Sequence, residues 1–364
     1  MMKDRDQKSK ALRLAVANRW LPQLEVDIEP VRAVDANAPL VTDLDVLAEI
    51  PDLLTGYRSL VFDCKTKAKE SAVNRAMWLS GLLKKINGAH GFCILKKKKI
   101  ELDHRLFADE LGVTLLTEDD FELYARSTSP DYDRPLGHIA SIDIWENYFA
   151  AVGKFEKLQL GLAFLRSEYW LAESAADSCR KTLAEIRKLH PEFDPDKKAH
   201  VALFFDFAAL FGRSLALIIS QVFKAHFHPD VQEDLSDALL VLLYGGREAY
   251  EHRNELYQRI LAKSPEGGAT NLSLPEWEAF LKLFRQLLDA PVEVQYSPSI
   301  LKEVGLSFFV DDADQAFAKT LCSEHPQAAR FSLLIASYLV KAAKLPPEFG
   351  KLTDQLLIPL QPIA

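Results

Sequence analysis

The sequence lacks the paired cysteines that a zinc site or a disulfide framework needs. Its four cysteines, Cys64, Cys93, Cys179 and Cys322, are widely spaced, and no two of them form a C-x-x-C pair. A reducing compartment suits such thiols best, so we predict a cytoplasmic protein.

The sequence also lacks the apolar segments that direct a chain to a membrane. The first ten residues are polar and charged, and the apolar stretch of a signal peptide does not follow them. The most apolar segment, residues 201–227, contains Asp206 and Arg213, so it falls short of the roughly 20 uninterrupted apolar residues that span a bilayer. We predict that this segment is a buried core helix.

An overall positive charge is missing as well, since the formal net charge is −8. Residues 1–127 hold 20 basic and 20 acidic residues, which leaves 24 basic and 32 acidic residues for the remainder. This balance argues against a protein that coats nucleic acid through a wide basic surface, but it allows a small basic groove. Positive charge does cluster in the first part, at Lys65, Lys67, Lys69, Arg75, Lys84, Lys85 and residues 96–99.

Several catalytic motifs are absent. There is no G-x-S-x-G nucleophile elbow and no phosphate-binding loop with its lysine. Gly245-Gly246-Arg247 follows a helical pattern instead of a strand, so we interpret it as a turn between two helices.

The first third of the chain shows alternating helix and strand patterns. Apolar residues at helical spacing predict a first helix over residues 7–21, ended by Pro22. The elements predicted after it are strands 31–35, 40–48 and 59–64, helix 67–86, strand 91–95, helix 101–111, strand 113–116 and a helix that Thr117 caps. This order predicts an α/β layer structure in which the later strands are parallel.

The chain changes character after residue 127. Ser and Pro residues at 127–130 and the sequence Pro135-Leu136-Gly137 indicate a linker, and nearly everything beyond them shows helical spacing. We therefore predict a domain over residues 1–127, a linker over 128–141 and a helical domain over 142–364.

Acidic residues and a lysine occupy two neighbouring predicted strands. Asp45 lies near the end of one strand, and Asp63-Cys64-Lys65 ends the next. Residues two apart in a strand share a face, so Asp63 and Lys65 point to one side while Cys64 points into the packing of the sheet. If the strands pair, two carboxylates and one ammonium converge.

Phosphodiester hydrolysis needs this combination of groups. Carboxylate oxygens hold Mg²⁺, and the metal polarises the phosphate and lowers the pKa of a bound water. A lysine beside the metal orients that water or stabilises charge in the transition state. The alternative is that Asp43, Asp45 and Asp63 face water at strand ends and Lys65 merely pairs with one of them.

The segments VTDLDVLAEI and YRSLVFDCKTK resemble the PD-(D/E)xK, or restriction-endonuclease-like, nuclease superfamily. Within it they look most like the Mrr-like and Holliday-junction-resolvase-like branches, where a strand of the type acid-hydrophobic-Asp-Val-Leu-Ala precedes one ending acid-Cys-Lys-Thr. The predicted elements after Lys65 follow the order of that core. The resemblance covers roughly residues 5–127 and implies a restriction-endonuclease-like α/β core, a mixed sheet flanked by helices, ahead of the mainly α-helical domain.

The resemblance implies roles for individual residues. Asp45, Asp63 and Lys65 would be catalytic, and Mg²⁺, or Mn²⁺ in its place, would be held by Asp45, Asp63 and the backbone carbonyl of Cys64. Many members carry a further glutamate in the first helix, whereas the helix predicted at 7–21 has none, and Glu25 and Glu29 follow Pro22. A single-metal site is therefore expected. Possible phosphate contacts come from Lys67, Lys96, Lys97 and Lys98.

The predicted function is that of a Mg²⁺-dependent DNA endonuclease, of a class that serves restriction, anti-phage defence or repair. The acidic helical domain suits a protein partner or a second copy of the chain better than DNA. The rival prediction is a catalytically inactive nuclease-fold subunit that acts in assembly or nucleic-acid binding.

Overall fold

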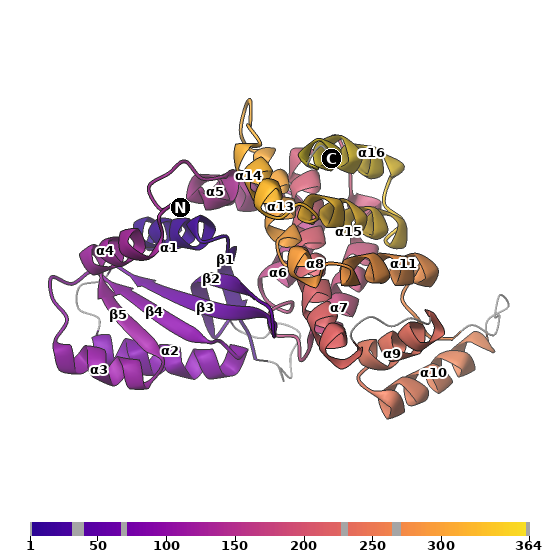
Figure 1. Cartoon of the computed structure of the whole chain (residues 1–364), viewed down its shortest axis with the longest axis horizontal. Coiled ribbons are helices and arrows are strands. Elements are labelled where there is room, and N and C mark those ends of the chain that lie inside the picture. The colour runs from indigo at the N-terminus through magenta and orange to yellow at the C-terminus, as the bar shows by residue number, and fades with distance from the viewer. Residues whose placement is uncertain (1, 31–39, 67–70, 227–231, 264–270, 362–364) are drawn as a thin grey trace.

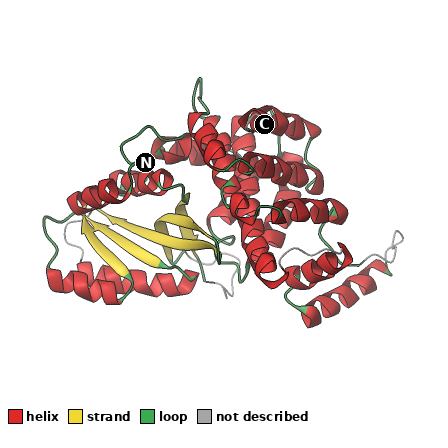
Figure 2. Cartoon of the chain, in the orientation of Figure 1, coloured by secondary structure: helices red, strands yellow, loops and turns green. Residues whose placement is uncertain are grey.

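The structure is a computed structural model that describes residues 2–30, 40–66, 71–226, 232–263 and 271–361. One half contains a five-stranded sheet with helices on both faces, and the other half is helical (Figures 1 and 2). The first half comprises α1 (Arg5–Ala17), β1 (Leu21–Ile28), β2 (Thr42–Asp52), β3 (Gly56–Lys65), α2 (Ala72–Ile86), β4 (His90–Leu95), α3 (Leu102–Glu110), β5 (Val113–Thr117) and α4 (Glu118–Thr128).

The strands lie in sequence order, β1-β2-β3-β4-β5. The pairs β1–β2 and β2–β3 are antiparallel, whereas β3–β4 and β4–β5 are parallel. Helices α1 and α4 cover one face, and α2 and α3 cover the other (Figure 1). The prediction of a mixed sheet flanked by helices is confirmed.

The first helix ends earlier than the sequence predicted. It stops at Ala17, and Arg19 adopts a left-handed φ of 63°, which breaks the helix well before Pro22. Pro22 is part of β1, a strand that the sequence analysis missed. Proline fits there because β1 lies at the edge of the sheet, where a missing N–H costs no ladder hydrogen bond on the open side. The predicted strand 31–35 lies outside the described residues.

The helix after β5 begins where the sequence predicted. The Thr117 hydroxyl accepts a hydrogen bond from the backbone N–H of Asp120 at 3.1 Å, and the Asp120 carboxylate accepts one from the N–H of Thr117 at 3.1 Å. Each side chain satisfies a donor that the helix leaves unpaired, which makes a capping box.

Replacing Thr117 with alanine should lower the free energy of unfolding by about 1 kcal/mol. Thermal melts of the purified protein measure this, with Thr128→Ala as the control, because the exposed Thr128 hydroxyl donates to the Tyr124 carbonyl at the other end of α4 and caps no free N–H. Equal melting temperatures for the two variants would contradict the assigned role of the cap.

The second half is built from helices. Its elements are η1 (His138–Ala140), α5 (Ile142–Val152), α6 (Glu156–Arg166), α7 (Ala175–Leu189), η2 (His190–Glu192), α8 (Lys198–His226), α9 (Gln232–Leu243), α10 (Arg247–Leu261), α11 (Trp277–Leu288), α12 (Pro291–Val294), α13 (Ser297–Ser307), α14 (Ala316–Glu324), α15 (Ala328–Ala342), α16 (Pro347–Leu357) and η3 (Ile358–Leu360). The prediction of a helical C-terminal part is confirmed.

Helix α8 is the central element of the helical half (Figure 1). Its stretch Lys198–Ala225 is long and apolar enough to cross a membrane, but 89% of its most apolar window is buried inside the fold. This burial is the setting of a core helix, as predicted, and is compatible with a soluble protein.

The two halves share one continuous hydrophobic core. It includes residues of α1, β2 and β3 together with residues of α5, α8, α13 and α15. Between the halves, Tyr132 and Ile139 are buried, and the Arg13 guanidinium donates to the carbonyls of Tyr132 and Arg134. The predicted linker is therefore packed against the fold, while the division into domains stays a prediction.

Candidate functional site

The regular alternation of β2 side chains between the two sides of the sheet is interrupted at Asp45. Leu44 packs in the smaller core beside α2, whereas Val46, two positions later, packs in the larger core beside α1. Residues two apart normally share a face, so the strand changes phase at Asp45. Glu25, beside it on β1, has a left-handed φ of 54°. This irregularity brings both carboxylates within reach of α1.

Asp45, Asp63 and Lys65 converge, as the sequence predicted if the strands pair. Lys65 Nζ lies 3.1 Å from Asp45 Oδ2 and 3.3 Å from Asp63 Oδ1. Asp45 also accepts a hydrogen bond of 2.7 Å from the backbone N–H of Cys64. The carboxylates are 3% and 2% exposed, so the alternative in which they face water does not describe them.

Burial and the neighbouring charges set the ionisation of this group. Burial raises the pKa of Asp45, although Lys8 and Lys65 oppose that shift. Burial opposes the charge on Lys65, but Asp63 and Asp45 outweigh it and raise the pKa of its ammonium. Lys65 is therefore held in the charged state, which suits a group that stabilises negative charge.

Lys8 enters the site from α1. Its Nζ lies 2.8 Å from Asp45 Oδ1 and forms an ion pair with Glu25. Its side chain is 1% exposed. Burial opposes the charge on Lys8, yet Asp45 and Glu25 outweigh it, so the pKa of the ammonium is raised. The carboxylate of Asp45 thus holds two lysines, one on each oxygen.

Arg75 on α2 holds the second carboxylate. Its Nε lies 2.8 Å from Asp63 Oδ2, and its Nη2 pairs with Asp63 Oδ1. The guanidinium also stacks over the Trp78 ring, 3.9 Å from its centroid. This two-pronged contact fixes the orientation of Asp63.

The start of α1 is attached to the end of β3. Gln7 Nε2 donates to the carbonyl of Lys65 at 3.1 Å and to Glu118 Oε1 at 2.8 Å. The N–H of Thr66 donates to Asp4 Oδ1 at 2.9 Å. These bonds fix the strand end that carries the predicted triplet.

Comparison with protein-family models, curated proteins and solved structures found no match. The assignment of a family therefore stays a prediction. The geometry of the residues themselves carries the argument that follows.

Three acidic residues could share a cation, and only one of them, Asp45, was predicted as a metal ligand. Carboxylate oxygens of Glu25, Asp43 and Asp45 lie within 4.8 Å of one another. Ligands on opposite sides of a Mg²⁺ ion with bonds of about 2.1 Å lie roughly 4.2 Å apart, so small side-chain rotations would let the three oxygens share one ion. The donor chemistry therefore fits a hard divalent cation.

Asp63 does not belong to this group of oxygens, and Arg75 and Lys65 engage its carboxylate. The predicted metal set of Asp45, Asp63 and the Cys64 carbonyl stays a prediction. The Cys64 side chain is buried, and burial raises its pKa well above the usual value. It is a core residue, as predicted, and is not arranged as a nucleophile.

Of the predicted phosphate contacts, Lys96 lies beside the triplet. The N–H of Lys96 donates to the carbonyl of Lys65 at 3.0 Å, so the loop that follows β4 begins next to the end of β3. Lys96 and Lys98 are exposed and Lys97 is half-buried. Lys67 lies outside the described residues. Contact of these lysines with phosphate stays a prediction.

Sequence reasoning missed the cations that hold the carboxylates. Lys8 was not singled out in the sequence, Arg75 was only counted as part of a basic cluster, and Glu25 was set apart because it follows Pro22. The signal that could have found Lys8 is its place in an apolar helix, one turn before the buried Leu12. A charged residue on the buried stripe of a helix needs a partner inside the fold.

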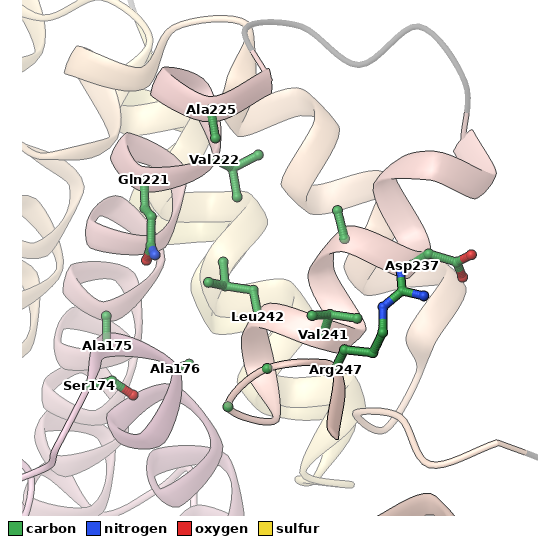
Figure 3. Close-up of a pocket in the computed structure, with 13 residues that line it drawn as sticks. Ser174, Ala175, Ala176, Gln221, Val222, Ala225, Asp237, Val241, Leu242 and Arg247 are labelled. Carbon is green, nitrogen blue, oxygen red and sulfur yellow. The ribbon is translucent and has the colours of Figure 1, made fainter. Parts of the chain in front are cut away.

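Two hollows differ in their relation to this site. A groove of about 280 Å³ reaches Glu25, and Phe149 and Arg166 of the helical half line it. The larger cavity, of about 790 Å³, lies between α7, α8, α9 and the start of α10. Figure 3 shows Val222, Val241 and Leu242 at its lining, with no predicted site residue among them.

The turn Gly245-Gly246-Arg247 borders this larger cavity. Both glycines have positive φ values, 90° and 105°, and they join α9 to α10. The interpretation as a turn between helices is confirmed. Glycine suits both positions because it adopts positive φ values without steric cost.

Proposed function

We propose that the protein is a metal-dependent endonuclease that hydrolyses phosphodiester bonds of DNA with Mg²⁺, or with Mn²⁺ in its place. The observation that carries this proposal is the position of Lys65 Nζ, 3.1 Å and 3.3 Å from the buried carboxylates of Asp45 and Asp63. A mixed five-stranded sheet with helices on both faces supports a restriction-endonuclease-like fold as part of the same proposal.

Each residue has a definite role in this proposal. Asp45, aided by Glu25 and Asp43, would hold the cation, whose chemistry is to polarise the phosphate and to acidify a bound water. Lys65 orients the attacking water and stabilises the charge that develops on the phosphate oxygens. Arg75 is a positioning residue, because it acts by holding Asp63.

The surroundings of the site support an anionic substrate. The exposed lysines at 96 and 98 belong to the loop after β4, and this loop begins next to Lys65 at the end of β3. Arg166 lines the groove at Glu25, where its guanidinium donates to the Glu25 carbonyl at 2.8 Å and pairs with Asp27 at 3.2 Å. The exposed lysines would hold a polyanionic backbone beside the carboxylate cluster through phosphate contacts.

The test is cleavage of plasmid and oligonucleotide DNA by the purified full chain. We expect nicking or linearisation with Mg²⁺ or Mn²⁺, and we expect EDTA to stop it because the carboxylates alone cannot polarise the phosphate. Cleavage that persists in EDTA would contradict the proposal. Absence of cleavage by the wild type, alone and in its native complex, would also contradict it.

A non-catalytic nuclease-fold subunit is the second candidate. Lys8, Lys65 and Arg75 engage the oxygens of Asp45 and Asp63 in the described conformation, and such pairing would serve a purely structural role equally well. DNA binding in a mobility-shift assay together with no cleavage under any metal condition would favour this candidate. The predicted protein partner or second copy at the helical half stays a prediction.

A further inference from the structure

Lys8 is the feature of the site that the proposed chemistry leaves unused. Its ammonium bridges Glu25 and Asp45, two of the three residues whose oxygens lie within 4.8 Å of one another. A charge buried to this degree is stable only when the carboxylates compensate it. The bridge therefore places an internal cation where the proposed divalent ion would find its ligands.

The two cations cannot use the same oxygens together without cost. A metal ion on Asp45 Oδ1 and Glu25 Oε1 would lie against the Lys8 ammonium, and like charges at such distances repel strongly in a buried setting. The backbone of α1 cannot relieve this repulsion easily, because Asp4 and Gln7 fasten its first turn to the end of β3. The flexible side chain of Lys8 is the part that can move.

We propose that Lys8 is a built-in competitor of the divalent cation, which closes the Glu25–Asp45 site until a metal ion displaces its ammonium. This inference rests on the proposed function, because it concerns the regulation of the same site. The competition lowers the affinity for the metal and keeps the carboxylates compensated while no metal is bound.

The first test measures Mn²⁺ affinity of the full chain by the electron paramagnetic resonance signal of free Mn²⁺. Lys8→Met removes the competing charge but keeps an unbranched side chain, and we expect it to bind Mn²⁺ about tenfold more tightly, the effect of one pKa unit of interaction. Lys10→Met is the matched control, because Lys10 lies on the same helix and pairs at 2.9 Å with Glu122 instead. Equal affinities for Lys8→Met and wild type would overturn the proposal.

The second test needs no variant, so it stands even if Lys8→Met fails to fold. Amines of the wild type are acylated with and without Mn²⁺, and the labelled lysines are identified by mass spectrometry. Lys8 should gain reactivity when the metal displaces it, whereas Lys302, which is also buried and pairs with Asp206, should stay protected. Protection of Lys8 at saturating Mn²⁺ would overturn the proposal.

These outcomes separate the inference from the proposed function. Tighter Mn²⁺ binding by Lys8→Met without DNA cleavage by any form would support the competition and contradict the nuclease. Mg²⁺-dependent cleavage by the wild type, with an unchanged Mn²⁺ affinity in Lys8→Met, would support the nuclease and contradict the competition. Mn²⁺ binding that survives Asp45→Asn would place the metal elsewhere and overturn the competition.

Discussion

Replacing Asp45 with asparagine should lower the rate of DNA cleavage by roughly a hundredfold to a thousandfold. The carboxylate lies at the meeting point of Lys8, Lys65 and the other acids, and a neutral amide is a poor ligand for a hard divalent ion. A metal ion held there would supply several kcal/mol of transition-state stabilisation, and each 1.36 kcal/mol corresponds to about a factor of ten in rate. Single-turnover cleavage of a labelled duplex measures the loss.

Glu49→Gln is the matched control for this variant. Glu49 is a buried carboxylate on the same strand, but among the described residues its side-chain partners are Arg213 at 2.8 Å and the Ser59 hydroxyl at 2.5 Å, and none of the predicted catalytic residues is among them. We expect it to destabilise the fold and to leave the cleavage rate of the folded protein near that of the wild type. A loss of cleavage in both variants would indicate that Asp45 acts through stability, which would contradict its place in the metal site.

The convergence of Asp45, Asp63 and Lys65 could be predicted from sequence because strand periodicity is a strictly local property. Residues two apart in a regular strand share a face, so the triplet at the end of β3 needed only a paired neighbour. The alternation of β2 side chains between the two sides of the sheet is interrupted at Asp45, and the residue types around Asp45 do not signal this interruption. For that reason the approach of Glu25 and Lys8 to Asp45 could not be predicted from spacing.

From β2 onward the elements of the first half were predicted in the correct order, and the error before β2 has a physical cause. Proline is a strong signal for the end of a helix, so Pro22 was taken to end α1. The helix in fact ends at Ala17 because Arg19 adopts a left-handed conformation, which no residue type at that position announces. Position at a sheet edge is decided by tertiary packing, and it is what makes proline acceptable in β1.

The contact between the halves is also invisible to sequence patterns, yet it joins residues far apart in the chain. Glu49 of β2 meets Arg213 of α8, and Tyr57 at the start of β3 donates to the carbonyl of Gln295. Lys302 of α13 donates to Gln23 of β1 at 2.9 Å. Each contact pairs a buried polar group that would be costly alone, so the sheet and the helices stabilise one another.

Arg213→Met should lower the free energy of unfolding by about 3–5 kcal/mol, because it leaves the charge of Glu49 buried without a compensating cation, with only the Ser59 hydroxyl among the described residues donating to it. The guanidinium donates to Glu49 Oε2 from Nη2 at 2.8 Å and from Nε at 3.1 Å, and it lies 4.7 Å from the centroid of the Trp170 ring. The loss therefore combines an uncompensated carboxylate with a lost cation–π contact. Urea unfolding followed by tryptophan fluorescence measures it.

A second substitution separates the cost of the unpaired charge from the cost of altered packing. Adding Glu49→Leu to Arg213→Met removes the charge that was left alone, and we expect the double variant to regain most of the lost stability, since apolar residues often replace a buried ion pair without penalty. Lys157→Met, which breaks an exposed pair with Glu192, should change stability by less than about 1 kcal/mol. If the double variant is as unstable as Arg213→Met, the loss comes from packing around Trp170, and the ion pair between β2 and α8 is not what holds the sheet to the helices.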